Sequence, residues 1–428
     1  MKKLLNIEYI SFLLFISIWL SINLDFKTLS FSTDNFKNLT LQIRTLLPIF
    51  LGIIFLIFKF KFFKFSSIKN LDLISKFFLA TFIVQSISFF IYRSDFHNTY
   101  FLILSFLLIL IINTHEFRKN IYIFFYISIF FLSIYLVMFL PSVINFYLNN
   151  DTIVFYNFNP NLSNNIFGLT PPRTSGISRV LFILLILINS IYFCYKKKYL
   201  LLLSGLILLL IYLCQSRSVL IFLSLYLLII SFIDFFNKKF KINYEIICMI
   251  LVSTFILITI NKIKYNHIIS KNVDRPHYIK RLQQQHVYKR DLSEIKKIVQ
   301  SNGRVEIWAK IFKENKNFLI GNGVMGDRFL INESAHNSLV YNYASGGIIC
   351  AILYLAIVFI LVIQLIRQYL FCKNNTLNKK DMILYNVNLI TIFFFIFRSI
   401  VETSYSVFSI DLILFFISYK FLNFRTSQ

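Results

Sequence analysis

The stretch RVLFILLILINSIYFCYKKKYLLLLSGLILLLIYLCQSRSVLIFLSLYLLIISFIDFF, residues 179–236, decides the fold. It contains three apolar runs, which are separated by the basic turn Lys196–Lys198 and by the short polar turn QSRS at 215–218. Each run approaches the length of about 20 apolar residues that a helix needs to cross a bilayer. The pattern therefore predicts three membrane-spanning helices joined by tight turns.

The same pattern continues over most of the chain. Its 428 residues are 57% hydrophobic and 15% charged, whereas about a quarter of the residues of a soluble domain are charged. We predict an all-α, polytopic transmembrane helix bundle that forms one integral membrane domain over residues 1–428. About twelve spans are expected, at 8–24, 45–60, 72–92, 99–114, 121–140, 179–195, 199–215, 218–236, 244–262, 337–366, 383–399 and 403–421.

Lysines and arginines mark every second connection between these spans, as they do at Lys196–Lys198. The positive-inside rule places the basic connections and both termini in the cytoplasm. The start of the chain, MKKLLNIEYISFLLFISIWLSINL, is expected to be a retained first helix, since no signal-peptide cleavage site follows. The net charge of +25 is explained by these short runs, so it does not indicate binding to nucleic acid.

Two substantial loops are then expected on the outer side, at 141–177 and 263–336. The larger loop is basic, but loops longer than about 60 residues are exempt from the positive-inside rule. Within it, Val305, Trp308 and Phe312 recur at helical spacing. We predict a short amphipathic helix from Arg304 to Glu314 at the membrane interface, with Trp308 as its anchor.

Glycines are concentrated in the same part of the chain. The protein has only ten, and six of them are Gly303, Gly321, Gly323, Gly326, Gly346 and Gly347. Glycine permits a positive φ and a close approach of two backbones. The cluster predicts a tightly shaped loop, with ordinary turns as the alternative.

Four arginines fall at outer edges of the predicted spans: Arg173, Arg179, Arg217 and Arg398. An arginine within a span costs about 2.5–3.5 kcal/mol on insertion scales, so it usually has a purpose. The guanidinium group suits bidentate contact with phosphate. These arginines share the outer face with Arg304, which predicts an anionic ligand at the outer leaflet. Simple snorkelling to lipid headgroups is the alternative.

His336 stands where the polar loop gives way to an apolar helix. An imidazole with a pKa of about 6.5 in a partly desolvated, water-accessible cleft can serve as a general base. The alternative is a hydrogen-bonded histidine that caps the start of the helix. Glu402 is expected to pair with Arg398, four residues before it, and a second acid–base role is the less favoured alternative.

No metal and no cofactor are expected. The five cysteines form no CxxC pair, and His267, His277 and His286 lack metal-ligand spacing with acidic residues or cysteine. The chain contains no GxGxxG, Walker lysine, GxSxG or HExxH motif, which removes support for nucleotide-driven and metalloprotease chemistry.

Several short motifs occur in a fixed order on one predicted side of the membrane. They are RTSG at 173–176, QSRS at 215–218, Gly303–Arg304 followed by Trp308, GNGVMG at 321–326, AHN at 335–337 and the glycine pair at 346–347. In this order the chain resembles the O-antigen polymerase and O-antigen ligase superfamily of bacterial inner-membrane glycosyltransferases. The chain departs from that pattern in KNFLIG, which lacks a proline, and in RTSGIS, which lacks the usual acidic residue and proline.

The resemblance implies a GT-C-like glycosyltransferase in the bacterial inner membrane, with its active face in the periplasm. The donor would be a glycan on undecaprenyl pyrophosphate, and the transfer would need no metal. His336 would act as the general base with Arg304 as its catalytic partner. The pyrophosphate and substrate would be bound by Arg173, Arg179, Arg217, Arg398, Asn337 and Glu402.

The leading hypothesis is an O-antigen or surface-polysaccharide polymerase, which transfers the growing chain onto another lipid-linked repeat unit. Two outer loops after the fifth and ninth spans, the loose motif match and the turn FRSIVETSY at 397–405 favour it. An O-antigen ligase acting on lipid A-core is the alternative, and a flippase or transporter of lipid-linked oligosaccharide is the second alternative. Membrane lipid and a chain-length regulator protein are the expected partners.

Overall fold

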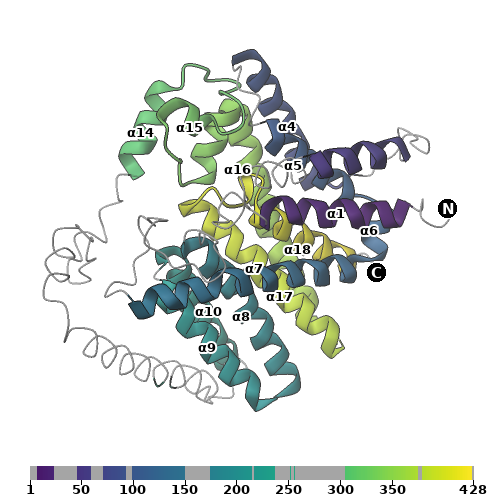
Figure 1. Cartoon of the computed structure of the whole chain (residues 1–428), viewed down its shortest axis with the longest axis vertical. Helices are drawn as coiled ribbons and strands as arrows, with labels where there is room; N and C mark the ends of the chain where they lie inside the picture. Colours follow the sequence, from purple (N-terminus) through teal and green to yellow (C-terminus); the bar gives the residue numbers. More distant parts are fainter. Residues whose placement is uncertain are drawn as a thin grey trace, which may run out of the picture.

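The computed structural model describes residues 7–23, 46–58, 71–92, 99–149, 174–214, 216–236, 251, 255, 304–374 and 378–426, and within them every regular element is a helix (Figure 1). In chain order these are α1 (Ile7–Asn23), a helix at Leu46–Phe58, α4 (Leu73–Tyr92), α5 (Thr99–Ile112), α6 (His115–Lys119), α7 (Ile121–Asn149), α8 (Thr174–Tyr195), α9 (Lys198–Cys214), α10 (Arg217–Phe236), α14 (Arg304–Glu314), α15 (Gly326–Ile331), α16 (Ser338–Asn374), α17 (Lys379–Val401), the 3₁₀ turn η4 (Ser404–Ser406) and α18 (Ile410–Thr426).

Long apolar helices dominate this part of the chain, as the sequence predicts. Four are long and apolar enough to cross a membrane, at Leu73–Tyr92, Gly176–Tyr195, Ser338–Phe371 and Lys379–Val401. Shorter apolar helices accompany them. The described structure is therefore a helical bundle with the character of a membrane protein.

Each predicted span within the described residues coincides with a helix, whereas the span predicted at 244–262 falls almost entirely outside them. Two predicted boundaries are wrong. The last helix begins at Ile410, not at residue 403, because Ser404–Ser406 form a 3₁₀ turn before it. The loop predicted at 141–177 is partly helical, since α7 continues through Pro141 to Asn149. A proline removes one backbone hydrogen bond, which a long helix can tolerate.

The span predicted at 337–366 is not one continuous helix. Gly346 and Gly347 leave helical geometry inside α16, with Gly347 at φ +64°. The turn at residues 318–323 fills the break, because Ile348 N–H donates to Phe318 C=O at 2.9 Å and Gly323 N–H donates to Ser345 C=O at 2.8 Å. The kink exposes backbone groups that this turn then satisfies.

The glycines at this kink are required by close packing of two backbones. A Cβ on Gly321 would lie 2.5 Å from the amide nitrogen of Gly347, and one on Gly347 would lie 2.2 Å from the carbonyl carbon of Leu319. Both glycines have a positive φ. The predicted tightly shaped loop is therefore present, and it is docked against α16.

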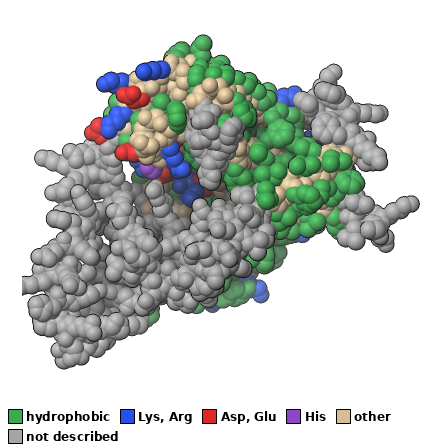
Figure 2. All heavy atoms as spheres, turned by 45° about the horizontal axis from the view of Figure 1, so that its top comes forward, with side chains coloured by type: hydrophobic (Ala, Val, Ile, Leu, Met, Phe, Trp, Pro, Cys, Tyr) green, Lys and Arg blue, Asp and Glu red, His purple; other side chains and the backbone are tan. Residues whose placement is uncertain are grey.

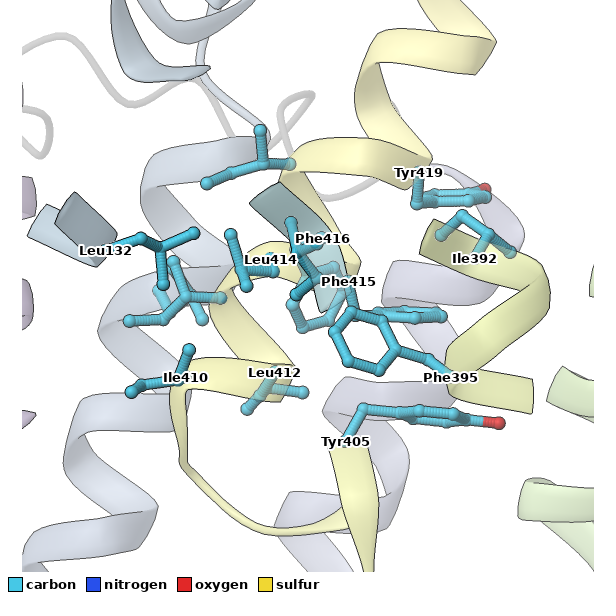
Figure 3. Packing of buried hydrophobic residues seen from close by; sticks show 14 of the residues in the cluster. Leu132, Ile392, Phe395, Tyr405, Ile410, Leu412, Leu414, Phe415, Phe416 and Tyr419 are labelled. Atoms are coloured by element: carbon cyan, nitrogen blue, oxygen red, sulfur yellow. The ribbon is translucent and has the colours of Figure 1, made fainter. Parts of the chain in front are cut away.

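Helix α18 is the most deeply enclosed element, with every side chain from Ile410 to Leu422 buried. Figure 3 shows Leu414, Phe415 and Phe416 of α18 between Leu132 of α7 and Phe395 of α17. The ring of Phe415 stacks on Tyr405 with centroids 4.5 Å apart. Such dispersion contacts hold helices together where lipid removes the hydrophobic driving force between them.

Polar contacts at one end of the bundle join residues that the sequence places on cytoplasmic connections. Asn120 donates to Glu8 at 2.5 Å, and Tyr122 donates to Asp381 at 2.7 Å. Lys420 forms a buried ion pair with Asp72. The start of α1 and the end of α18 lie on the same side of the molecule (Figure 1).

Candidate functional site

The loop between α15 and α16 presents His336, and its neighbour Ala335 fixes that loop to the protein. Ala335 is fully buried. Its N–H donates to the carboxylate of Asp327 at 2.8 Å, and its C=O accepts a 2.7 Å hydrogen bond from the indole of Trp308. The loop is thus held from α15 on one side and from α14 on the other.

The amphipathic helix predicted from Arg304 to Glu314 is confirmed with these bounds. The prediction that Trp308 is its membrane anchor gains no support, because Trp308 packs against the buried cluster around Ile311 and bonds to Ala335. The large apolar side chains that α14 leaves exposed are Val305 and Phe312.

Asn337 follows His336 and caps α16. Its side-chain oxygen accepts from Val340 N–H at 3.0 Å, and its amide nitrogen donates to Ile400 C=O at 2.8 Å. This is N-cap geometry, which satisfies a free backbone donor at a helix start. These two hydrogen bonds position the loop, and the substrate contact of Asn337 stays a prediction.

His336 projects from this loop with φ +48°, a left-handed conformation that is uncommon for residues with a side chain. Its Nδ1 lies 3.0 Å from Oε2 of Glu402, and the two side chains are 29% and 21% exposed. In the described part of the chain no hydrogen-bond partner is found for Nε2. In the neutral tautomer whose Nδ1–H donates to the carboxylate, Nε2 is the unprotonated nitrogen and can accept a proton.

Glu402 is bound on its other side by Arg304. The guanidinium of Arg304 lies 3.6 Å from Oε1 of Glu402 and donates to Val401 C=O at 2.9 Å. Burial raises the pKa of Glu402, but the hydrogen bond with His336 and the charges of Arg398, His336 and Arg304 outweigh it, and the pKa lies below its usual value. Glu402 therefore stays ionised beside the imidazole.

The prediction that Glu402 pairs with Arg398 is wrong. Arg398 instead forms an ion pair with Asp411 at the start of α18, and Arg179 donates to the other oxygen of that carboxylate at 2.7 Å. The helix ends at Val401, so the chain turns and carries the Glu402 side chain towards α14 and α16. A helical i, i+4 pair is no longer possible once the second residue has left the helix.

Asp411 is the residue that sequence reasoning missed. It is an isolated carboxylate in the apolar run IDLILFFIS, and it is almost fully buried. A charge within a span is costly unless it is paired, so such a residue signals a cationic partner. Arg179 and Arg398 are those partners.

The two carboxylate-centred groups together form the candidate site. Their described side chains are three arginines, two carboxylates and His336. Figure 2 looks onto this end of the molecule and shows Lys, Arg, Asp and Glu side chains gathered beside a histidine, next to a broad hydrophobic surface. The site can attract an anion whose other part is apolar.

Two predicted ligands of the anion are not placed by the structure. Arg173 lies outside the described residues, and α10 begins at Arg217, whose side chain is also outside them. Among the described side chains, no group of three or more His, Cys, Asp or Glu could hold a metal ion.

No protein-family model matches the chain. No curated protein matches it with significance. What the site can do is therefore judged from its own geometry.

Proposed function

We propose that the chain is a polymerase of a surface polysaccharide, located in the bacterial inner membrane, which uses a glycan on undecaprenyl pyrophosphate as donor. The observation that carries this proposal is the hydrogen bond between His336 Nδ1 and Glu402. It couples a proton acceptor to an ionised carboxylate beside three arginines.

The reaction would be a direct displacement. The hydroxyl oxygen of the acceptor sugar attacks the anomeric carbon of the donor, and the bond from that carbon to the pyrophosphate oxygen breaks. Nε2 of His336 takes the hydroxyl proton, and the anomeric configuration inverts. Glu402 stabilises the imidazolium, as a carboxylate does in other histidine-dependent sites.

The arginines would balance the charge that develops on the departing undecaprenyl pyrophosphate. Guanidinium groups bind phosphate oxygens through paired, charge-assisted hydrogen bonds. Fixed cations are effective because they need no reorganisation as charge moves to the leaving group. Undecaprenyl pyrophosphate is already a good leaving group. The proposed reaction therefore uses only this chain's own side chains.

Ligation to lipid A-core would use the same donor and the same side chains, so the acceptor alone separates it from polymerisation. A transporter is the other alternative, and buried ion pairs such as Lys420–Asp72 are found in transporters. This pair and the Arg398–Asp411 pair lie at opposite ends of α18, about 14 Å apart by helical rise.

The test is to delete the gene in the bacterium that carries it and to examine the surface polysaccharide. Polymerase activity predicts loss of long chains, with a single repeat still attached to lipid A-core. Loss of all attachment would indicate a ligase, and loss of lipid-linked repeats from the outer leaflet would indicate a flippase.

Complementation then ties the phenotype to the site. Wild-type protein and His115→Ala should restore long chains, because His115 begins α6 at the other end of the bundle. His336→Ala should not restore them, although the protein is present in the membrane. Full restoration by His336→Ala would remove His336 as the base.

A further inference from the structure

We propose that α14 and the turn after it form a surface that binds anionic phospholipids of the outer leaflet. Helix α14 lies beside α15 and α16 at one end of the described structure (Figure 1). The exposed side chains of this interfacial surface are Phe312, Lys313, Lys316, Phe318 and Leu319. Binding of bilayer lipid here requires no glycan donor, so it does not depend on the proposed function.

The exposed half of α14 has an apolar flank and a charged flank. With 3.6 residues per turn, residues three or four positions apart lie on the same side of a helix. The apolar flank is formed by Val305, Ala309 and Phe312. The charged flank is formed by Glu306, Lys310 and Glu314, and Lys313 lies between the two. A helix with this division lies along a membrane surface, with its apolar flank turned to the acyl chains.

Aromatic contacts join this apolar flank to the turn after α14. The ring of Phe312 lies 5.0 Å from the ring of Tyr343, and the ring of Phe318 lies 6.3 Å from it, measured between centroids. Tyr343 belongs to the first segment of α16, before the kink. Phe312 and Phe318 are nevertheless 53% and 55% exposed. Both rings therefore rest on one side chain and form one outward-facing apolar surface.

The interfacial surface continues onto the second segment of α16. Ile348 N–H, just past the kink, donates to Phe318 C=O at 2.9 Å. From there, exposed apolar side chains follow one side of the helix at Ile349, Ile352, Leu355 and Phe359. Leu319, also exposed, adds to them at the kink. Because α16 is long and apolar enough to cross a membrane, this stripe faces lipid, and the side chains that extend it meet the same lipid.

The kink in α16 falls at the outer boundary of the hydrocarbon layer. The residues from Gly347 to Ile366 are all uncharged, and they match the length of about 20 residues that crosses this layer. Arg367 then marks the inner boundary, on the side where the sequence predicts the cytoplasm. Phe318 and Leu319 pack at the kink, so they lie at the level where acyl chains meet headgroups.

The lysines beside these apolar side chains indicate the class of headgroup. Lys313 follows Phe312, and Lys316 lies two residues before Phe318. Their long side chains can reach lipid phosphates while the rings enter the acyl region. The glutamates of α14 lie on the charged flank, each one turn from Lys310. Lys313 and Lys316 are therefore placed to attract anionic headgroups such as that of phosphatidylglycerol.

The first experiment measures the depth of this surface, with the full chain in lipid nanodiscs. A fluorescent label is attached to Phe318→Cys in a background without the five native cysteines, and its quenching by lipids brominated on their acyl chains is recorded. Strong quenching is expected, because position 318 lies at the acyl boundary. Glu306→Cys with the same label is the matched control. It lies on the charged flank of α14 and should be quenched much more weakly.

The second measurement tests the lysines with the same label at position 318. Brominated phosphatidylglycerol should be enriched over brominated phosphatidylcholine by about fivefold for each lysine that contacts it. Lys313→Gln combined with Lys316→Gln should abolish this preference. Lys310→Gln is the control and should retain it, because Lys310 lies on the charged flank.

Equal quenching of the labels at positions 318 and 306 would overturn the inference. So would equal quenching by the two lipids, or an unchanged preference when Lys313 and Lys316 are both replaced. Weak quenching at position 318 by both lipids would show that something other than lipid covers the surface, which also overturns it. No glycan donor is present in these measurements, so their result is separate from that of the polymerase test.

Discussion

At the scale of single residues, His336 combines a strained backbone conformation with a hydrogen bond to Glu402. Its positive φ costs roughly 1–2 kcal/mol for a residue with a Cβ, yet Ala335 and Asn337 hold the loop on both sides. The conformation aims the imidazole at Glu402. Backbone strain of this kind is common at functional sites, because a conformation that costs stability is retained where function requires it.

His336→Asn separates the two contributions. Asparagine tolerates the left-handed region, so the variant should keep a melting temperature close to that of the wild type. It offers no titratable base, so chain elongation by the purified protein should fall by about 100-fold or more. His115→Asn is the control and should leave elongation unchanged. Equal elongation by the His336→Asn protein would contradict a role in proton transfer.

Glu402 links the site to pH. Because its folded pKa lies below the unfolded value, Glu402 adds stability above the unfolded pKa of about 4.3. That stability is lost as pH falls through the lower, folded pKa. Wild type should therefore melt at a higher temperature than Glu402→Gln at pH 7, and the difference should shrink below about pH 4. A gap that does not shrink at all as the pH falls below about 4 would show that the charge of Glu402 is not its source.

At the scale of elements, the kink in α16 and the turn at 318–323 act as one unit. The backbone of the turn enters the break that Gly346 and Gly347 create, and Ser88 of α4 donates to Gly321 C=O at 2.6 Å. The first segment of α16 begins at Ser338, two residues after His336. The glycine kink thus sets the position of the His336 loop relative to α4.

Gly347→Ala tests this dependence. Its methyl group would meet the backbone of Leu319 at 2.2 Å and would require a positive φ. We expect strain and overpacking to destabilise the protein by about 2–5 kcal/mol. Chain elongation should fall at least as much as the fraction of folded protein. Gly52→Ala is the control, since its methyl group would meet only the movable side chain of Leu107. Comparable stability of the two variants would argue against rigid docking of the turn.

Hydropathy and helical spacing are sufficient to predict helices such as α8, α9 and α14, because these signals are local. The pairing of charges is not local. Arg398 and Glu402 have the spacing of a helical ion pair, but the helix ends between them. Asp411 lies beyond the turn at Ser404–Ser406, which no simple sequence pattern predicts. Only the packing of α8, α17 and α18 decides which carboxylate each arginine meets.

At the scale of the whole molecule, the alternation of basic connections carried the most information about the site. It predicts that Arg179, Arg304, His336 and Arg398 share one face. The structure brings these residues together through Glu402 and Asp411 at one end of the bundle. The side on which a loop lies can be predicted, because the lysines and arginines of short loops set the orientation of the spans during membrane insertion. The pairing of side chains depends on how the helices pack in the folded bundle.

Which end faces the periplasm can be tested with single cysteines in a background without the five native ones. Glu333 is exposed in the loop that carries His336, and Lys197 is exposed between α8 and α9. A membrane-impermeant maleimide added to cells with a permeabilised outer membrane should label Glu333→Cys. Lys197→Cys should react only after the inner membrane is broken, because the positive-inside rule places Lys196–Lys198 in the cytoplasm. The reverse pattern would put the His336 site in the cytoplasm, where a polymerase acting on exported repeat units could not use it.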